Sequence, residues 1–230
     1  MHNVLVLSFE GFSFSSRQLY QQLLPKLLSR AVVHESNELD DALHFILSGW
    51  PSTILVTDPY ITLENDDSRR LLQAVAGHTK HGCITVLMGF FSSTVHHSRL
   101  DHILKHTFDL RWRVASFTTD TTRLLTPESS LLRRTSLVAS FYAKALFLGK
   151  VPIAQTIYSS STGGFAYAAY GSVGLGKLGY IGDVNFEDES ERCILAMCHL
   201  DREEDFLEDS NDMIGGPASD DMIEEDTWYS

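Results

Sequence analysis

Short apolar runs alternate with segments of helical periodicity along the first half of the chain. Apolar runs of strand length cover residues 4–9, 31–34, 53–57 and 84–88. Apolar side chains recur at helical spacing over residues 19–28, 38–50, 66–78 and 93–108, and Pro25 predicts a kink or a late start in the first of these helices. A continuous apolar run is typical of a strand that is covered on both faces. The alternation therefore predicts right-handed βαβ crossovers and an α/β fold with a doubly wound, mostly parallel sheet.

The pattern becomes less regular after Leu110. The remaining segments indicate strands or an excursion at 112–117 and 121–125, a helix or extended cover at 137–148, a strand pair at 156–160 and 166–169, a hairpin leading into a last core strand at 173–182, and a closing helix at 190–200. We therefore expect an antiparallel excursion in the second half of one α/β domain that spans residues 1–200.

The acidic charge of the chain is concentrated at its end. The formal net charge is −12, yet the residues from Asp201 onward carry twelve acidic side chains and one base, Arg202. The segment 201–230 also holds three small apolar pairs, at 213–214, 222–223 and 228–229. This composition predicts an acidic, largely disordered tail. It either only solubilises the domain or docks on a basic or apolar surface, of a partner or of its own domain.

Charge and apolar content also limit the partners and the setting. Residues 1–200 are nearly neutral and show no basic patch, so we expect no nucleic-acid partner. No apolar stretch approaches the ~20 residues of a membrane helix, and the first residues lack the features of a signal peptide, so we expect no membrane partner. The cysteines Cys83, Cys193 and Cys198 form no disulfide or metal pattern, which favours a reducing, cytoplasmic setting.

Candidate site residues follow the strands of the predicted sheet. In an open parallel sheet, ligands bind beyond the carboxyl ends of the strands. The residues at these ends, which we take as candidate ligand-binding residues, are Glu10, Gly11, Asp58, Gly89, Phe90, Phe91, Ser92, Ser93, Asp183 and Asn185. Three of them carry groups suited to catalysis: Ser92, Asp58 and Asp183.

Each catalytic candidate also has a structural interpretation. Ser92 follows a strand that breaks at a glycine, as in a nucleophile elbow or an anion site, but the preference of Ser for the N-cap position favours Ser92 or Ser93 as the cap of a helix. Asp58 precedes a proline and suits an Asx-turn, and Asp183 with Asn185 suits a turn between strand and helix. These alternatives stay open at the level of sequence.

Two further patterns carry little weight. Four histidines, His96, His97, His102 and His106, lie on one predicted helix, but they show no zinc-binding spacing, and a solvated helix face is the simpler interpretation. The glycines of 174–179 lack the Gly-Lys-Ser/Thr ending of a phosphate loop and precede a strand instead of a helix. We therefore expect neither a bound metal nor a cofactor.

The order of elements resembles the class I glutamine amidotransferase-like superfamily, with its flavodoxin-like sheet. In particular it resembles small fungal proteins of that group and, more distantly, ThuA-type (trehalose-utilisation) domains. The resemblance spans roughly residues 3–200, and its most specific part is the glycine hairpin that leads into Gly182-Asp183-Val184-Asn185. The other segments that carry it are 4–9 with the following loop, 55–59 and 89–93.

The resemblance implies an amidotransferase-like domain without the amidotransferase reaction. The enzymes of the superfamily use a Cys on the elbow, a His after a late strand and a following Glu. Here Phe90, Phe91 and Ser92 occupy the elbow, and no His follows the late strand. We therefore expect a catalytically silent domain that binds a small molecule or a protein partner, including a second copy of itself. The alternative is a hydrolase-type enzyme that uses Ser92 with Asp58, Glu10 or Asp183.

Overall fold

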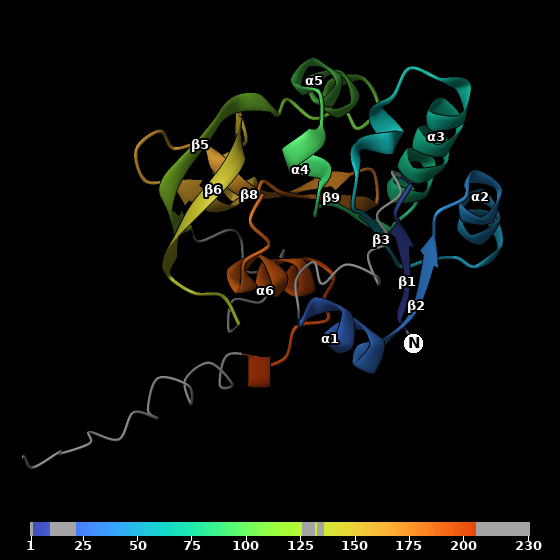
Figure 1. Ribbon diagram of the computed structural model, residues 1–230, viewed down its shortest axis with the longest axis horizontal. Helices are drawn as coiled ribbons and strands as arrows, with labels where there is room; N and C mark the ends of the chain where they lie inside the picture. Colours follow the sequence, from blue (N-terminus) through green and yellow to red (C-terminus); the bar gives the residue numbers. More distant parts are fainter. Residues whose placement is uncertain (1, 10–21, 126–131, 133–135, 206–230) are drawn as a thin grey trace, which may run out of the picture.

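One mixed β-sheet organises the part of the chain that the structure describes. The structure, a computed structural model, describes residues 2–9, 22–125, 132 and 136–205 (Figure 1). Its strands are β1 (His2–Leu7), β2 (Ala31–Ser36), β3 (Thr53–Val56), β4 (Ile84–Leu87), β5 (Arg113–Leu124), β6 (Ser140–Gly149), β7 (Thr156–Ser160), β8 (Ala166–Val173) and β9 (Gly176–Ile181). They follow the order β2-β1-β3-β4-β9-β8-β6-β5-β7.

Helices connect the strands of the first half and follow the last strand. The α-helices are α1 (Leu23–Arg30), α2 (Leu39–Ser48), α3 (Asp66–Lys80), α4 (Phe91–Thr94), α5 (His97–His106) and α6 (Asp188–Met197), and the 3₁₀-helices are η1 (Pro59–Thr62) and η2 (Ile153–Gln155). In these described ranges, no helix is long and apolar enough to cross a membrane.

The first four strands lie where the apolar runs predict them. β1 pairs in parallel with β2 and β3, and β3 pairs in parallel with β4. The late start of the first helix is confirmed, because α1 begins at Leu23 and holds Pro25 in its first turn, where no intrahelical N–H bond is lost. Local pattern was therefore sufficient for the βαβ units of the first half.

The prediction of a doubly wound, mostly parallel, flavodoxin-like sheet is wrong. Beyond α5 the chain does not continue with βα units but builds antiparallel pairs: β5 with β6 and β7, β8 with β6 and β7, and β8 with β9. Because β7 bonds to both β5 and β8, the strands β8, β6, β5 and β7 close into a small antiparallel barrel. The segment 137–148, for which a helix or extended cover was predicted, forms β6. The antiparallel part is thus a main body of the fold and not an excursion.

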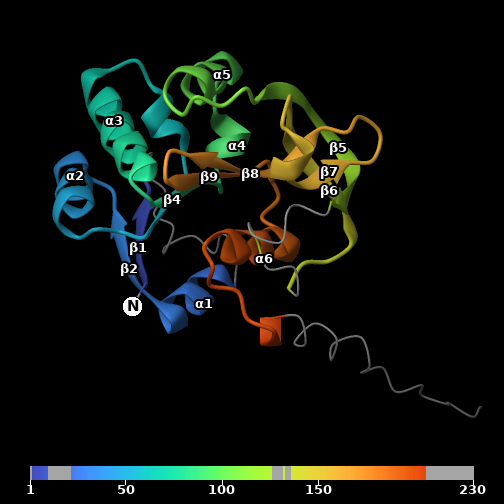
Figure 2. The ribbon, with the colours of Figure 1, turned by 180° about the vertical axis from the view of Figure 1, so that it is seen from behind.

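Helices cover both faces of the parallel strands. In Figures 1 and 2, α1 and α6 lie on one side of the sheet, and α2, α3 and α5 lie on the other. Alternate residues of each strand serve the two cores: Val4 and Val6 belong to the core beneath α1 and α6, whereas Leu5 and Leu7 belong to the core beneath the other helices. Burial on both faces accounts for the unbroken apolar runs of the sequence.

The turn between β8 and β9 brings the last strand against α3. Gly174 has φ +61°, the left-handed region that favours glycine. Gly176 packs directly on backbone, because a Cβ there would lie 2.1 Å from the Thr79 carbonyl oxygen and 2.2 Å from that of Cys83. The entry of β9 into the sheet beside β4 therefore requires a residue without a side chain.

Gly176→Ala should destabilise the fold by about 2–4 kcal/mol, because its methyl group can be accommodated only if backbone moves. Gly77→Ala is the matched control: a Cβ there meets nothing within 4 Å, and removal of a helical glycine should stabilise the protein by about 0.5–1 kcal/mol. Urea unfolding of both variants measures the difference. Equal stabilities would contradict the close approach at Gly176.

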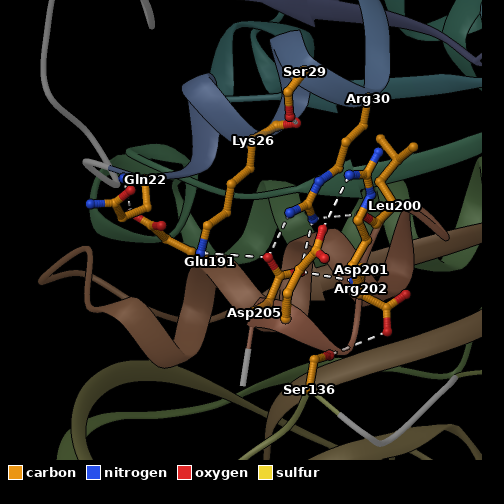
Figure 3. A network of polar contacts seen from close by, with 11 residues as sticks. Gln22, Lys26, Ser29, Arg30, Ser136, Glu191, Leu200, Asp201, Arg202 and Asp205 are labelled. Carbon is orange, nitrogen blue, oxygen red and sulfur yellow. Dashed lines mark hydrogen bonds and ion pairs between the residues drawn. The ribbon is translucent and has the colours of Figure 1, made fainter. Parts of the chain in front are cut away.

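A network of charged side chains joins α1 to α6 and to the segment after α6 (Figure 3). Arg30 donates to both carboxylate oxygens of Asp205, at 2.8 and 2.6 Å, and to the carbonyl of Leu200. Glu191 of α6 accepts the backbone N–H of Gln22, at 3.0 Å, at the start of α1. Asp205 and Glu191 are both buried. Residues 201–205, which the sequence analysis assigned to the tail, therefore contact the domain.

Glu191 makes the stability of this contact dependent on pH. Burial raises the pKa of its carboxyl from an ordinary 4.5 to about 7. Folding is therefore favoured when this carboxyl is protonated. Relative to the ionised form, the protonated form adds roughly 3 kcal/mol to the free energy of unfolding, which is present in full below pH 4.5 and is lost as pH rises through 7. Glu191→Gln keeps an acceptor for Gln22 and should flatten the free energy of unfolding between pH 5 and 8. Glu189→Gln on the same helix should leave that pH dependence unchanged.

Candidate functional site

The candidate residues gather at the carboxyl ends of the parallel strands. The register aligns Leu7 with Val56, Val56 with Leu87, and Leu87 with Tyr180, so these strands end side by side. The residues that follow them, which include Asp58, Ser92 and Asp183, form what we call the rim. Glu10 and Gly11, also predicted for this edge, lie outside the described residues.

Asp58 ties the end of β1 to the turn after β3. Its carboxylate accepts the backbone N–H of Phe9 at 2.6 Å and that of Tyr60 at 3.0 Å, which caps η1. The rings of Phe9 and Tyr60, the two residues that it joins, stack on each other with centroids 4.6 Å apart. Asp58 is only 3% exposed. The geometry is that of the Asx-turn interpretation.

The break after β4 has the shape of an elbow, but its hydroxyl groups bond to main-chain oxygens. Gly89 has φ +66°, and a Cβ there would lie 3.1 Å from the Thr57 carbonyl. Ser92 donates to the carbonyl of Ile181 at 2.6 Å, and Ser93 donates to that of Phe90 at 2.9 Å. The N-cap of α4 is Phe90, without a side-chain bond, so the prediction that Ser92 or Ser93 caps the helix is wrong.

Phe90 and Phe91 separate this elbow from a catalytic one. Phe91 is fully buried in the core beneath α3 and α5. Phe90 packs against the opposite core and meets the ring of Phe186 edge to face, with centroids 5.0 Å apart. The two rings therefore anchor the turn to both sides of the sheet, at the place where a nucleophile would be presented.

Asp183 organises the passage from β9 into α6. Its carboxylate accepts the backbone N–H groups of Asn185 and Glu187, at 3.0 and 3.1 Å, and the hydroxyl of Ser190 at 2.7 Å. The hydroxyls of Ser190 and Tyr167 lie 2.6 Å apart. Burial raises the pKa of Asp183 despite these bonds. Asn185 is exposed and donates to the Glu187 carboxylate.

These contacts limit the chemistry of the rim. A serine nucleophile requires an adjacent base that accepts its proton. The hydroxyl of Ser92 is directed at a main-chain carbonyl, which is no base. The carboxylates of Asp58 and Asp183 are both held by backbone N–H groups. The arrangement therefore supplies no nucleophile–base pair from these three residues.

A cavity that the sequence analysis missed opens beside the rim. It has a volume of about 570 Å³ and lies between η1 with the following loop and α5; its lining residues are Pro59, Thr62, Leu63, Glu64, Thr94, His96, Ser98, Arg99 and His102. A second hollow of about 340 Å³ adjoins it and shares five of its lining residues: Thr62, Leu63, Glu64, Arg99 and His102. An ion pair between Arg99 and Glu64 stands where the two hollows meet. The spacing of His96, Arg99 and His102, three residues apart, was the available sequence signal.

The histidines of this helix do not form a metal centre. The rings of His102 and His106 lie 4.6 Å apart, and Nδ1 of His96 is hydrogen-bonded to Ser98 at 3.0 Å. Across the described ranges, no group of three or more His, Cys, Asp or Glu side chains is arranged to hold a metal ion. Two of them, His96 and His102, line the cavity instead.

Ser92→Ala should lower the free energy of unfolding by about 1–2 kcal/mol, because it leaves the buried Ile181 carbonyl without its donor. In a domain of this size that corresponds to a fall of roughly 2–8 °C in the melting temperature. Ser93→Ala removes an exposed hydroxyl and serves as the control, with no comparable loss expected. A melting temperature unchanged in Ser92→Ala would show that its hydrogen bond has no structural importance.

The known proteins that this chain resembles are similar in structure and not in sequence. No protein-family model and no curated protein matches the sequence. The chain is similar to a ThuA-like protein from Bacteroides uniformis (TM-score 0.55, 11% identity, 86% of this chain and 90% of that chain). It is also similar to a cytoplasmic protein from Salmonella typhimurium LT2 (TM-score 0.54, 12% identity, 94% and 100%). A β-galactosidase from Bacillus circulans is similar over 86% of this chain but only 31% of the enzyme (TM-score 0.50, 10% identity). At identities this low, the comparisons establish only that the chain shares a fold with these proteins, among them a ThuA-like protein.

Proposed function

We propose that the chain is a catalytically silent member of the glutamine amidotransferase-like superfamily that acts by binding a ligand. The observation that carries this proposal is the engagement of all three catalytic candidates in main-chain hydrogen bonds. The structural similarity to a ThuA-like protein supports the distant part of the relationship. The similarity to a protein described as cytoplasmic supports the same setting for this chain.

The cavity between η1 and α5 is the best place for a small-molecule ligand. Its volume lies within the range of small-molecule sites, and it adjoins the strand ends where ligands bind in open α/β sheets. The hydroxyls of Thr62 and Thr94 donate to main-chain carbonyls, so their oxygens are left to accept hydrogen bonds from a ligand. Arg99 and the two histidines line the same cavity and carry N–H groups suited to a polar or acidic ligand. A protein partner is the alternative ligand class for the same silent domain.

A hydrolase that uses Ser92 is the alternative function, and the rim argues against it. The hydroxyl would have to leave the Ile181 carbonyl and find a base. Such a change would also remove a buried hydrogen bond from the junction of β9 and α4. The phenol of Tyr180 also lies within hydrogen-bond reach of Ser92, but it offers no base, because burial raises the pKa of that phenol far above its ordinary value.

We expect no release of ammonia from glutamine and no ester hydrolysis by the purified chain above the rate of the Ser92→Ala variant. Activity that disappears in Ser92→Ala, with the fold intact, would establish the hydrolase alternative. The same preparation can be screened for binding by native mass spectrometry against a metabolite mixture. A bound small molecule should be lost in Arg99→Gln and retained in Arg111→Gln, which removes an exposed arginine outside the cavity. Retention in both variants would contradict binding in this cavity.

A further inference from the structure

The outward face of the β5–β6 ladder carries cations and aromatic rings. Register pairs Thr119 with Lys144, Thr121 with Tyr142, and Arg123 with Ser140. Alternate positions such as Asp120, Thr122 and Ala143 are buried. The outward positions are therefore Phe117, Thr119, Thr121, Arg123, Ser140, Tyr142 and Lys144, which we call the ladder face.

The ladder face is chemically unusual for this acidic protein. None of its seven positions holds an acidic residue, and two of them are cationic. Tyr142 is 66% exposed and Phe117 is 48% exposed, and the Lys144 amine lies 5.5 Å from the centroid of the Phe117 ring. Exposed aromatic rings beside cations suit a ligand that combines negative charge with apolar or aromatic groups.

The last described residues of the chain lie near one end of this face. The hydroxyl of Ser136 donates to the carboxylate of Asp201 at 3.2 Å, and β6 begins four residues later, at Ser140. Ser140 is the partner of Arg123 in the ladder. Arg30 holds Asp205 by two hydrogen bonds, so the position from which residue 206 departs is fixed (Figure 3). In Figures 1 and 2 this segment lies below the β5–β6 ladder.

The composition of residues 206–230 is complementary to that of the ladder face. It holds eight acidic side chains and no basic one, and it carries the pairs Met213-Ile214, Met222-Ile223 and Trp228-Tyr229. Acidic side chains can pair with Arg123 and Lys144, and the aromatic pair can pack on Tyr142 and Phe117. We propose that residues 206–230 bind the ladder face of the same molecule and cover it.

The length of the segment permits this contact. Twenty-five residues span up to about 80 Å when extended, whereas a domain of this size has a radius of gyration of only roughly 17 Å. The proposal is independent of ligand binding in the cavity beside the rim, so either can fail alone.

The test uses the full chain labelled with 5-fluorotryptophan, whose three resonances belong to Trp50, Trp112 and Trp228. A labelled peptide of residues 206–230 gives the position of free Trp228. In the wild type, the Trp228 resonance should differ from that position. In the double variant Arg123→Gln with Lys144→Gln it should move toward it, as the ratio of bound to free tail falls about two- to thirtyfold with the loss of two exposed ion pairs.

Two control variants test whether the effect depends on the positions of these two charges. The double variant Lys80→Gln with Lys105→Gln removes the same charge from α3 and α5 and should leave Trp228 unmoved, and Arg123→Lys with Lys144→Arg should restore the wild-type position. The resonance of buried Trp112 reports that each variant is folded. A wild-type Trp228 at the free position, or an equal response in the control variant, overturns the proposal. A shift that disappears on dilution would assign the contact to a second copy and also overturn it.

Discussion

The pairing of β9 with β4 is the constraint on which the rest of the structure depends. β9 is parallel to β4 on one side and antiparallel to β8 on the other, so it joins the βαβ half of the chain to the barrel. Its entry is fixed by the close contact of Gly176 with the carbonyls of Thr79 and Cys83. Its exit supplies the Ile181 carbonyl that accepts the hydroxyl of Ser92. One strand therefore fixes both the topology and the chemistry of the rim.

The first half of the fold could be predicted because its strands are buried on both faces. Runs such as 4–9 and 53–57 are apolar without interruption, and short connections leave little choice of topology. The segment that became β6 could not be assigned in the same way. Leu146 and Leu148 are buried alongside Ala145 and Phe147, so the apolar positions do not alternate. Only the pairing with β5 and β8 decides between helix and strand there, and that pairing is a tertiary contact.

The position of the candidate site could be predicted from the topology, but the hydrogen bonds of its residues could not. The carboxyl-end rule named Asp58, Ser92 and Asp183, and the register brings these strand ends together. The partner of Ser92 lies 89 residues away, so no local pattern distinguishes a structural hydroxyl from a reactive one. Composition likewise assigned Asp205 to the tail, although its carboxylate is held by Arg30, 175 residues earlier. The cavity residues were visible only as a run of polar positions along α5.

The strands of the barrel, β5 to β8, lie between β4 and β9 along the chain, and this has a consequence for the order of folding. Leu87 and Gly176, which end and begin these hydrogen-bonded neighbours, are separated by 88 residues, and closing a flexible loop of that length costs roughly 4 kcal/mol of chain entropy beyond a constant. If the antiparallel strands form first, the intervening chain becomes compact and most of that entropy is lost before β9 docks. The barrel, closed early, would then act as a folding nucleus. The edge of β4 would remain unpaired until the barrel is complete and β9 docks.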